Sequence, residues 1–256
     1  TLAWSTHRHF ELYYAVSGIG AVLHTINPRL HPDQVAWVAN HAEDSVLMFD
    51  ISFGELVGEI AGKLDTVKTF VAMTDRAHLP AAAPAGTLVY EELVAAQTPE
   101  FDWPEIDERA ASGLCYTSGT TGNPKGVVYT HRAAVLQTML ISSIDFFPRH
   151  GAGQLEVMMP MAPMFHGNAW NMPFVAPYTG SKLVLPGRNY EPDKLYELLE
   201  GEKVTITGLV PPLALMTVGI SLHGVAYGYL RGKPAVVAAN VVQLMVLAVA
   251  PCAAFL

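Results

Sequence analysis

Residues 116–126 read YTSGTTGNPKG, and this short segment combines five hydroxyl side chains, three glycines and one lysine. A glycine-rich turn between two apolar strands can point successive backbone N–H groups inward, and such a nest binds phosphate oxygens. The hydroxyls of the four Ser and Thr residues add donors, and the ammonium of Lys125 adds a mobile positive charge. The segment therefore predicts a loop that holds a polyphosphate.

The spacing of this segment differs from that of the Walker P-loop. The Walker pattern places a second glycine five residues after the first, and a Ser or Thr directly after the lysine. Here Pro124 and Gly126 occupy those two positions. The pattern excludes a P-loop NTPase but keeps phosphate binding. An ordinary surface hairpin is the alternative, although turn chemistry alone needs far fewer of these residues.

Strands and helices alternate on both sides of this loop. Apolar, β-branched runs predict strands over 22–28, 45–50, 67–73, 113–117, 126–130, 154–161, 182–186 and 203–210. Apolar residues at helical spacing predict helices over 7–22, 31–44, 53–64, 90–97, 131–143 and 191–202. This alternation is typical of βαβ units, so we predict an α/β fold with a mostly parallel sheet and helices on both faces over residues 1–210.

Composition narrows the classes of function. The chain has 256 residues, 15% of them charged, and a net charge of −8 without a basic block, which argues against nucleic acid as a partner. Cys115 and Cys252 lie far apart in unlike sequence, so no disulfide framework is expected and a cytoplasmic location is the default. The first residues carry neither an initiating Met nor the features of a signal peptide, so we expect the sequence to begin inside a domain.

The loop resembles the phosphate-binding signature of adenylate-forming enzymes, the superfamily of acyl-CoA synthetases, luciferases and peptide-synthetase adenylation domains. The resemblance continues in THRAAVL (130–136) and in MAPMFHGNAW (161–170), which is similar to the acyl-pocket motif of the fatty acyl-CoA synthetase branch. Residues 2–50 and 180–205 are also similar to that branch. The likeness covers about four fifths of the chain but only the middle of the family's full length.

This resemblance implies a two-step ligase reaction. A carboxylate attacks the α-phosphate of ATP to give an acyl-adenylate and pyrophosphate, and the thiol of coenzyme A then displaces AMP. The implied small molecules are ATP with Mg²⁺, coenzyme A and a carboxylic acid. The residues matching the phosphate-binding motif are Thr117, Ser118, Gly119, Thr120, Thr121, Gly122, Lys125 and Gly126. Those matching the acyl and adenylate pocket are His166, Asn168 and Trp170. No residue is assigned as catalytic or as a metal ligand.

His166 and Trp170 of the pocket motif allow two interpretations. His166 and Trp170 are four residues apart and would share one face of a helix. In similar enzymes they border the acyl-adenylate, but a buried His beside a packing Trp is the structural alternative. The methionines at 158, 159, 161 and 164 are expected to fill the core rather than line an acyl pocket. His7 and His9 cannot share a helix face, and Cys115 lacks a basic neighbour that would activate its thiol.

The end of the chain is different in character. After Lys203 the only charged residues are Arg231 and Lys233, so residues 211–256 form a hydrophobic helical tail in this interpretation. Its two uncharged flanks are each long enough to span a bilayer, which makes a membrane hairpin one reading. Part of the tail also resembles the last segment of SWEET-type sugar transporters. A wrongly joined end and a buried pair of core helices are the other readings.

These observations lead to one expectation and two rivals. We expect an incomplete fatty acyl-CoA synthetase, specific for an aliphatic acid, that cannot complete adenylation by itself, because the family's later motifs do not follow residue 210. The rivals are a membrane-tethered nucleotide- or acyl-binding pseudoenzyme and a sugar-transporter fragment fused to a synthetase piece. The sequence leaves the chain length of the acid and the oligomeric state undetermined.

Overall fold

The computed structural model of the chain describes residues 1–117, 124–143 and 155–208. The α-helices in these ranges are α1 (His7–Gly18), α2 (Pro32–His41), α3 (Gly54–Ile60), α4 (Tyr90–Ala95), α5 (His131–Ile141), α6 (Met172–Thr179) and α7 (Pro192–Gly201). The strands are β1 (Leu23–Thr25), β2 (Val46–Phe49), β3 (Thr69–Ala72), β4 (Leu88–Val89), β5 (Ala111–Thr117), β6 (Lys125–Thr130), β7 (Val157–Pro160), β8 (Lys182–Leu183) and β9 (Ile206–Gly208). Short 3-10 helices cover Ile51–Phe53, Ala61–Lys63, Arg76–His78 and Gly167–Asn171.

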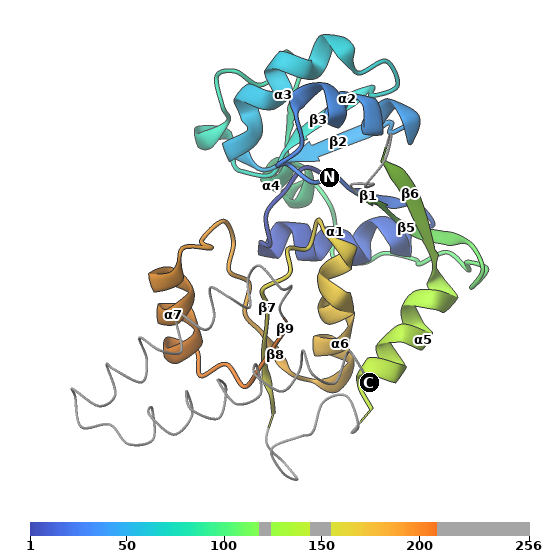
Figure 1. Ribbon diagram of the computed structural model, residues 1–256. Helices are drawn as coiled ribbons and strands as arrows, with labels where there is room; N and C mark the ends of the chain where they lie inside the picture. The colour runs from blue at the N-terminus through green and yellow to red at the C-terminus, as the bar shows by residue number, and fades with distance from the viewer. Residues whose placement is uncertain (118–123, 144–154, 209–256) are drawn as a thin grey trace.

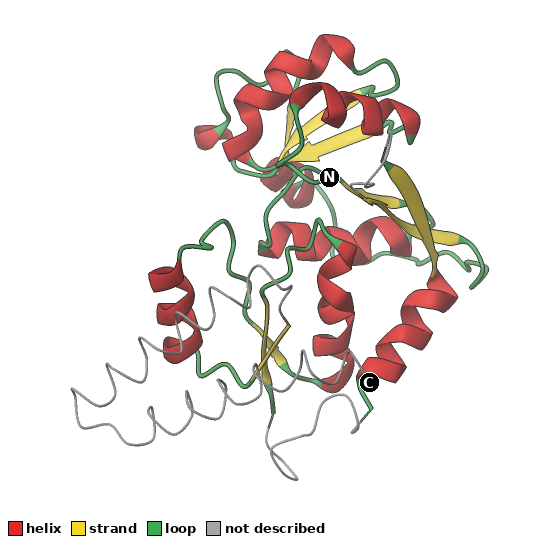
Figure 2. Ribbon diagram, in the orientation of Figure 1, coloured by secondary structure: helices red, strands yellow, loops and turns green. Residues whose placement is uncertain are grey.

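The strands of the described ranges form three separate three-stranded sheets, in the orders β1-β5-β6, β2-β3-β4 and β8-β7-β9. In Figure 1 the β2-β3-β4 sheet lies at the top with α2 and α3, and the β7–β9 sheet lies at the bottom with α6 and α7. Helix α1 crosses between these two parts, beside β1 and β5 (Figures 1 and 2). The β1-β5-β6 sheet therefore lies where the parts meet.

The strand pairing confirms most of the predicted topology and corrects one part of it. All strand pairs in the described residues are parallel except β5 and β6, which run antiparallel from Thr117↔Lys125 to Ala111↔Thr130. The segment between these two strands is too short for the crossover that a parallel pair requires, so they close as a hairpin. The sequence predicted one mostly parallel sheet, but the described strands are divided among three.

The helices begin where the sequence supplies capping groups. The Thr6 hydroxyl accepts a hydrogen bond from the backbone N–H of His9 at the start of α1, and the Thr130 hydroxyl accepts one from Ala133 at the start of α5. Helix α2 starts with Pro32 and a capping box between His31 and Gln34. His31 therefore serves as a helix cap.

Helices cover both faces of the β1–β5 pair. On one face Tyr116 packs against Trp37 and His41 of α2. On the other face Leu23 belongs to a buried cluster with Leu12 and Tyr13 of α1. The predicted cover on two faces is confirmed here, and it fixes the strand that leads into the glycine-rich segment.

Two groups of predicted features lie outside the described residues. The first is the middle of the glycine-rich segment, with Ser118, Gly119, Thr120, Thr121 and Gly122. The second is the hydrophobic tail over 211–256. Among the helices of the described ranges, none combines the length and the apolar character needed to span a bilayer.

Candidate functional site

The glycine-rich segment connects the end of β5 to the start of β6. Thr117 and Lys125 are paired residues of the two strands, and the Thr117 hydroxyl donates to the Lys125 carbonyl oxygen over 3.4 Å. Lys125 and Gly126 are exposed, and no carboxylate of the described residues lies within ion-pair distance of the Lys125 ammonium. The hairpin thus presents a positive charge, unpaired among the described residues, beside the segment that the sequence assigns to phosphate.

An aromatic cluster packs against the end of β5, next to the glycine-rich segment. The hydroxyl of Tyr116, directly before Thr117, lies 2.6 Å from Nδ1 of His41. The His41 ring stacks on Trp37 with ring centroids 4.7 Å apart, and Trp37 meets the Tyr116 ring edge-on. Burial raises the pKa of Tyr116, so its hydroxyl keeps its proton at neutral pH. This cluster ties the end of β5 to helix α2.

A buried His–Asp pair lies behind the same strand. Nδ1 of His24 on β1 is 2.7 Å from Oδ2 of Asp44, and the two side chains are 4% and 13% exposed. Burial lowers the pKa of His24, with the carboxylate of Asp44 opposing that shift. A neutral His24 donates from Nδ1 to Asp44, while its Nε2 is buried without a hydrogen-bond partner among the described residues.

The segment after His166 forms a left-handed turn. Gly167, Asn168, Ala169, Trp170 and Asn171 all have positive φ, between 49° and 67°. For residues other than glycine, this conformation costs on the order of 1–2 kcal/mol each. Such strain persists only where surrounding contacts impose it, and it is concentrated at functional sites.

This turn corrects one prediction. His166 and Trp170 were expected to share a helix face if the segment was helical, but the left-handed backbone removes the right-handed i, i+4 relation. Trp170 is 46% exposed and lines a cavity, whereas His166 is exposed and lies outside the cavity lining.

Hydrogen bonds fix both ends of the turn. Asn168 Oδ1 lies 3.3 Å from the hydroxyl of Tyr13 and 3.3 Å from the thiol of Cys115, and it accepts from both. Asn171 Nδ2 donates to the hydroxyl of Thr138 over 2.7 Å and to the carbonyl oxygen of Ala134 over 3.2 Å. The turn is thus tied to α1 and β5 at one end and to α5 at the other.

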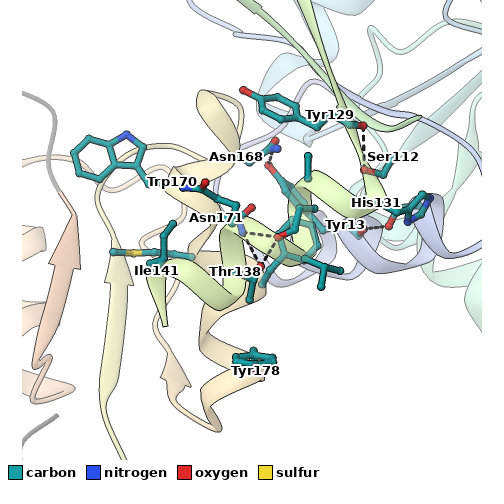
Figure 3. Close-up of a pocket in the computed structure, with 18 of the residues that line it drawn as sticks. Tyr13, Ser112, Tyr129, His131, Thr138, Ile141, Asn168, Trp170, Asn171 and Tyr178 are labelled. Atoms are coloured by element: carbon teal, nitrogen blue, oxygen red, sulfur yellow. Dashed lines mark hydrogen bonds between the residues drawn. The ribbon is translucent and has the colours of Figure 1, made fainter. Parts of the chain in front are cut away.

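The turn forms part of the wall of a cavity of about 1110 Å³. The cavity lies between α1, α5, α6 and the turn, and it reaches the base of the hairpin at Ser112, Gly113 and Tyr129. Its lining is mostly apolar and aromatic. Figure 3 shows the labelled side chains around it, with hydrogen bonds joining Asn171 to Thr138 and Asn168 to Tyr13.

The other residues that the sequence singled out lie either at the cavity or in the core. Of the predicted pocket residues, the structure brings Asn168 and Trp170 to the cavity. The methionines expected in the core are buried there, at positions 158, 159, 161 and 164. Burial raises the pKa of Cys115, in agreement with the prediction that its thiol is not activated. Sequence reasoning missed the contributions of Tyr13 and Thr138, since no local pattern connects them to Asn168 or Asn171.

The described residues contain no candidate metal site. Across the described ranges, no three His, Cys, Asp or Glu side chains come together in a way that could hold a metal ion. The sequence assigned no metal ligands.

Comparison with protein families places the chain in context. The model of the AMP-binding enzyme family matches residues 1–252. The chain is 48% identical over 213 residues to the 3-methylmercaptopropionyl-CoA ligase of Ruegeria pomeroyi, covering 83% of this chain and 39% of the ligase. It is 46% identical over 211 residues to the medium-chain-fatty-acid–CoA ligase of Ectopseudomonas oleovorans, covering 82% and 38%.

A third relative and one solved structure complete the comparison. The chain is 47% identical over 215 residues to the long-chain-fatty-acid–CoA ligase of Thermus thermophilus, covering 84% of this chain and 38% of that ligase. The crystal structure of the anthranilate CoA ligase AuaEII with anthranoyl-AMP shares the fold, with a TM-score of 0.72 at 20% identity over 85% of this chain and 40% of that one. The chain spans about two fifths of the length of these relatives.

Proposed function

Because the chain belongs to the AMP-binding enzyme family, we propose that it is the part of an AMP-forming acyl-CoA ligase that holds the ATP phosphates and the acyl chain. The observation that carries the proposal is the mostly apolar cavity of about 1110 Å³ at the base of the hairpin whose tip bears the glycine-rich segment. The proposed phosphate site and the proposed acid site thus lie at the two ends of one hairpin.

The hairpin tip is assigned to the β- and γ-phosphates of ATP. The residues proposed to contact them are Thr117, Ser118, Gly119, Thr120, Thr121, Gly122, Lys125 and Gly126. The described part of this set fits a polyanion, because Lys125 is exposed and no described carboxylate competes for its charge. Backbone N–H groups and hydroxyls in a glycine-rich turn supply the donors that phosphate oxygens require.

The cavity is assigned to the aliphatic chain of the acid. Its volume of about 1110 Å³ slightly exceeds the roughly 300–1,000 Å³ typical of small-molecule pockets. Its aromatic and aliphatic wall favours a chain of methylene groups over a hydrophilic acid. Asn168 and Trp170 of the left-handed turn contribute to that wall, and His166 lies next to the turn on the exposed side. The related medium-chain and long-chain ligases support the same class of substrate.

The proposed reaction has two displacement steps. An oxygen of the carboxylate attacks the α-phosphorus of ATP, the bond to the β-phosphate bridging oxygen breaks, and pyrophosphate leaves. The sulfur of coenzyme A then attacks the acyl carbon, its thiol proton is released, and AMP leaves. The described residues contribute position and charge rather than a nucleophile. Mg²⁺ would neutralise phosphate charge in this reaction, but no described residue is assigned to it or to coenzyme A.

The rivals drawn from the tail receive no support. The three relatives above, at 46–48% identity, are ligases, and the family match runs through residue 252, which includes all of the segment that resembled a transporter. Neither a membrane-tethered pseudoenzyme nor a transporter fragment is favoured. The boundary at residue 210 and the cytoplasmic location stay predictions.

The cavity assignment can be tested by filling the cavity. Ala134 on α5 lines the cavity, whereas Leu136 on the same helix does not and is 51% exposed. We expect Ala134→Trp to weaken decanoate binding by roughly tenfold or more, because a new ring occupies the space of several methylene groups. Leu136→Trp should bind like the unmodified chain in isothermal titration calorimetry. Equal affinities for all three proteins would overturn the acyl assignment.

A further inference from the structure

Asn168 connects the cavity wall to the strand that carries the glycine-rich segment. Its position in the chain is two residues before Trp170, while Cys115, which donates to its Oδ1, is two residues before Thr117. The contact therefore joins the two functional segments through side chains that the proposed reaction does not use.

The direction of the hydrogen bonds follows from the chemistry of the groups. An amide oxygen can only accept, so the Cys115 thiol must donate to Asn168 Oδ1. The Thr25 hydroxyl, 3.2 Å from the Cys115 sulfur, is then the donor to that sulfur. The chain of donors runs from Thr25 through Cys115 to Asn168, and a chain of this kind is strengthened by mutual polarisation in a dry interior.

These groups are shielded from water. Thr25 is 2% exposed, Cys115 is 5% exposed and Tyr13 is 2% exposed. Thr25 and Cys115 are also paired residues of the parallel β1–β5 ladder, so the backbone already fixes the distance between them. The Tyr13 hydroxyl shares its single hydrogen between Asn168 Oδ1 and the Met164 carbonyl oxygen just before the turn. Asn168 is thus held from two elements at once.

The backbone of the turn needs such an anchor. A left-handed turn with four residues other than glycine is not stable on its own. Asparagine tolerates positive φ better than most residues, so Asn168 contributes both a permissive backbone and a side chain that is bound to β5 and α1. The orientation of Trp170 depends on this turn, since its side chain is nearly half exposed and has few other contacts to fix it.

We propose that Cys115 and Asn168 are positioning residues, which hold the left-handed turn against β5 and thereby set Trp170 as a wall of the acyl cavity. This inference rests on the proposed function for the identity of the ligand, but not for the geometry. The thiol acts as a hydrogen-bond donor and takes no part in the chemistry.

Three variants separate this role from simple packing. Cys115→Ala removes the donor, while Cys115→Ser restores a donor of similar size. Asn168→Gly keeps the freedom to adopt positive φ but removes the amide, so it separates the side-chain anchor from the backbone preference. Each variant is made in the full chain, with and without Trp170→Phe, so that the difference in near-ultraviolet circular dichroism isolates the Trp170 signal.

We expect Cys115→Ala and Asn168→Gly to lose most of the Trp170 signal and to weaken decanoate binding by roughly three- to tenfold. Cys115→Ser should recover both properties. Urea unfolding curves establish that the variants remain folded at the assay temperature. If Cys115→Ala does not fold, the comparison rests on Asn168→Gly and Cys115→Ser.

Two results would overturn the proposal. One is an Asn168→Gly variant with the Trp170 signal and decanoate affinity of the unmodified chain, which would leave only a backbone preference. The other is equal behaviour of folded Cys115→Ala and Cys115→Ser. A failure of the unmodified chain to bind decanoate would contradict the proposed function instead, and the Trp170 signal would still decide the positioning role.

Discussion

Lys125 is the residue on which the phosphate assignment depends most. It begins β6, opposite Thr117, and its ammonium is exposed at the tip of a hairpin whose base is fixed by strand pairing. A cation on a fixed strand end can reach a phosphate without ordering a long loop first. The lysine was identified from the sequence because it stands among glycines and hydroxyl side chains, and this combination is typical of a phosphate-binding loop.

The first prediction concerns this charge. Lys125→Ala should weaken ATP binding to the chain by roughly ten- to a hundredfold, because a charge-assisted hydrogen bond to phosphate is lost. Lys125→Arg keeps the positive charge and should retain most of the affinity. Equilibrium dialysis with labelled ATP measures both variants. An ATP affinity that is the same in Lys125→Ala as in the unmodified chain would remove the hairpin tip from the nucleotide site.

At the level of single elements, close backbone approach limits what helix α3 can carry. A Cβ atom at Gly58 would lie 2.2 Å from the carbonyl oxygen of Ala82, which is a backbone atom and cannot turn aside. At Gly62, just beyond the helix, a Cβ atom would meet nothing within 4 Å. A side chain is therefore excluded at Gly58 by the backbone of Ala82, whereas the space around Gly62 would accept one.

The second prediction follows from this difference. Gly58→Ala gains about 1 kcal/mol of helix propensity but should still lower the free energy of unfolding by roughly 1–3 kcal/mol, because the backbone near Ala82 must shift. Gly62→Ala should leave stability unchanged or raise it by about 0.4–1 kcal/mol. Urea unfolding followed by circular dichroism measures both. Equal stability of the two variants would show that the contact with Ala82 imposes no constraint.

The elements also show what sequence patterns can and cannot predict. Alternating apolar runs located most of the described helices and strands, because burial on one face leaves a period in the sequence. The left-handed turn at Gly167–Asn171 left no such period, and the spacing of His166 and Trp170 was interpreted for a right-handed helix. Its conformation is imposed by Tyr13, Cys115 and Thr138, which lie far away in the chain.

The division into three sheets was equally hidden. Every described strand except β4 was predicted locally, but which strands are neighbours depends on how crossover segments pack, and the sequence contains no local signal for that. The hairpin between β5 and β6 is the exception, because the short connection allows only an antiparallel pair.

On the scale of the whole molecule, the packing of α1 makes stability depend on pH. His9 is fully buried, with Nδ1 3.0 Å from the Trp4 carbonyl oxygen and Nε2 3.0 Å from the Thr1 hydroxyl. Burial lowers the pKa of His9 from 6.5 to about 3. An unfolded chain takes up this proton near pH 6.5, whereas the folded protein takes it up only near pH 3. The unfolded state therefore binds more protons between these values.

The third prediction is a loss of stability with acid in this window. The free energy of unfolding should fall as the pH decreases from 6.5 towards 3, by up to about 1.4 kcal/mol per pH unit from His9 alone. The pKa of His24 is lowered too, which acts in the same direction. His9→Gln cannot be protonated and should flatten the dependence in urea unfolding measured at several pH values. An unchanged slope in His9→Gln would contradict the assigned pKa.

The chain as a whole combines a hairpin to which we assign the ATP phosphates with an apolar cavity at its base, and it spans about two fifths of the length of its ligase relatives. The most direct test is a crystal structure of the 256-residue chain with decanoate and a non-hydrolysable ATP analogue. We predict that the alkyl chain lies between α5 and α6 beside Trp170, with the terminal phosphates at the Lys125 ammonium. Decanoate outside this cavity, or phosphates bound away from the hairpin tip, would contradict the ligase assignment.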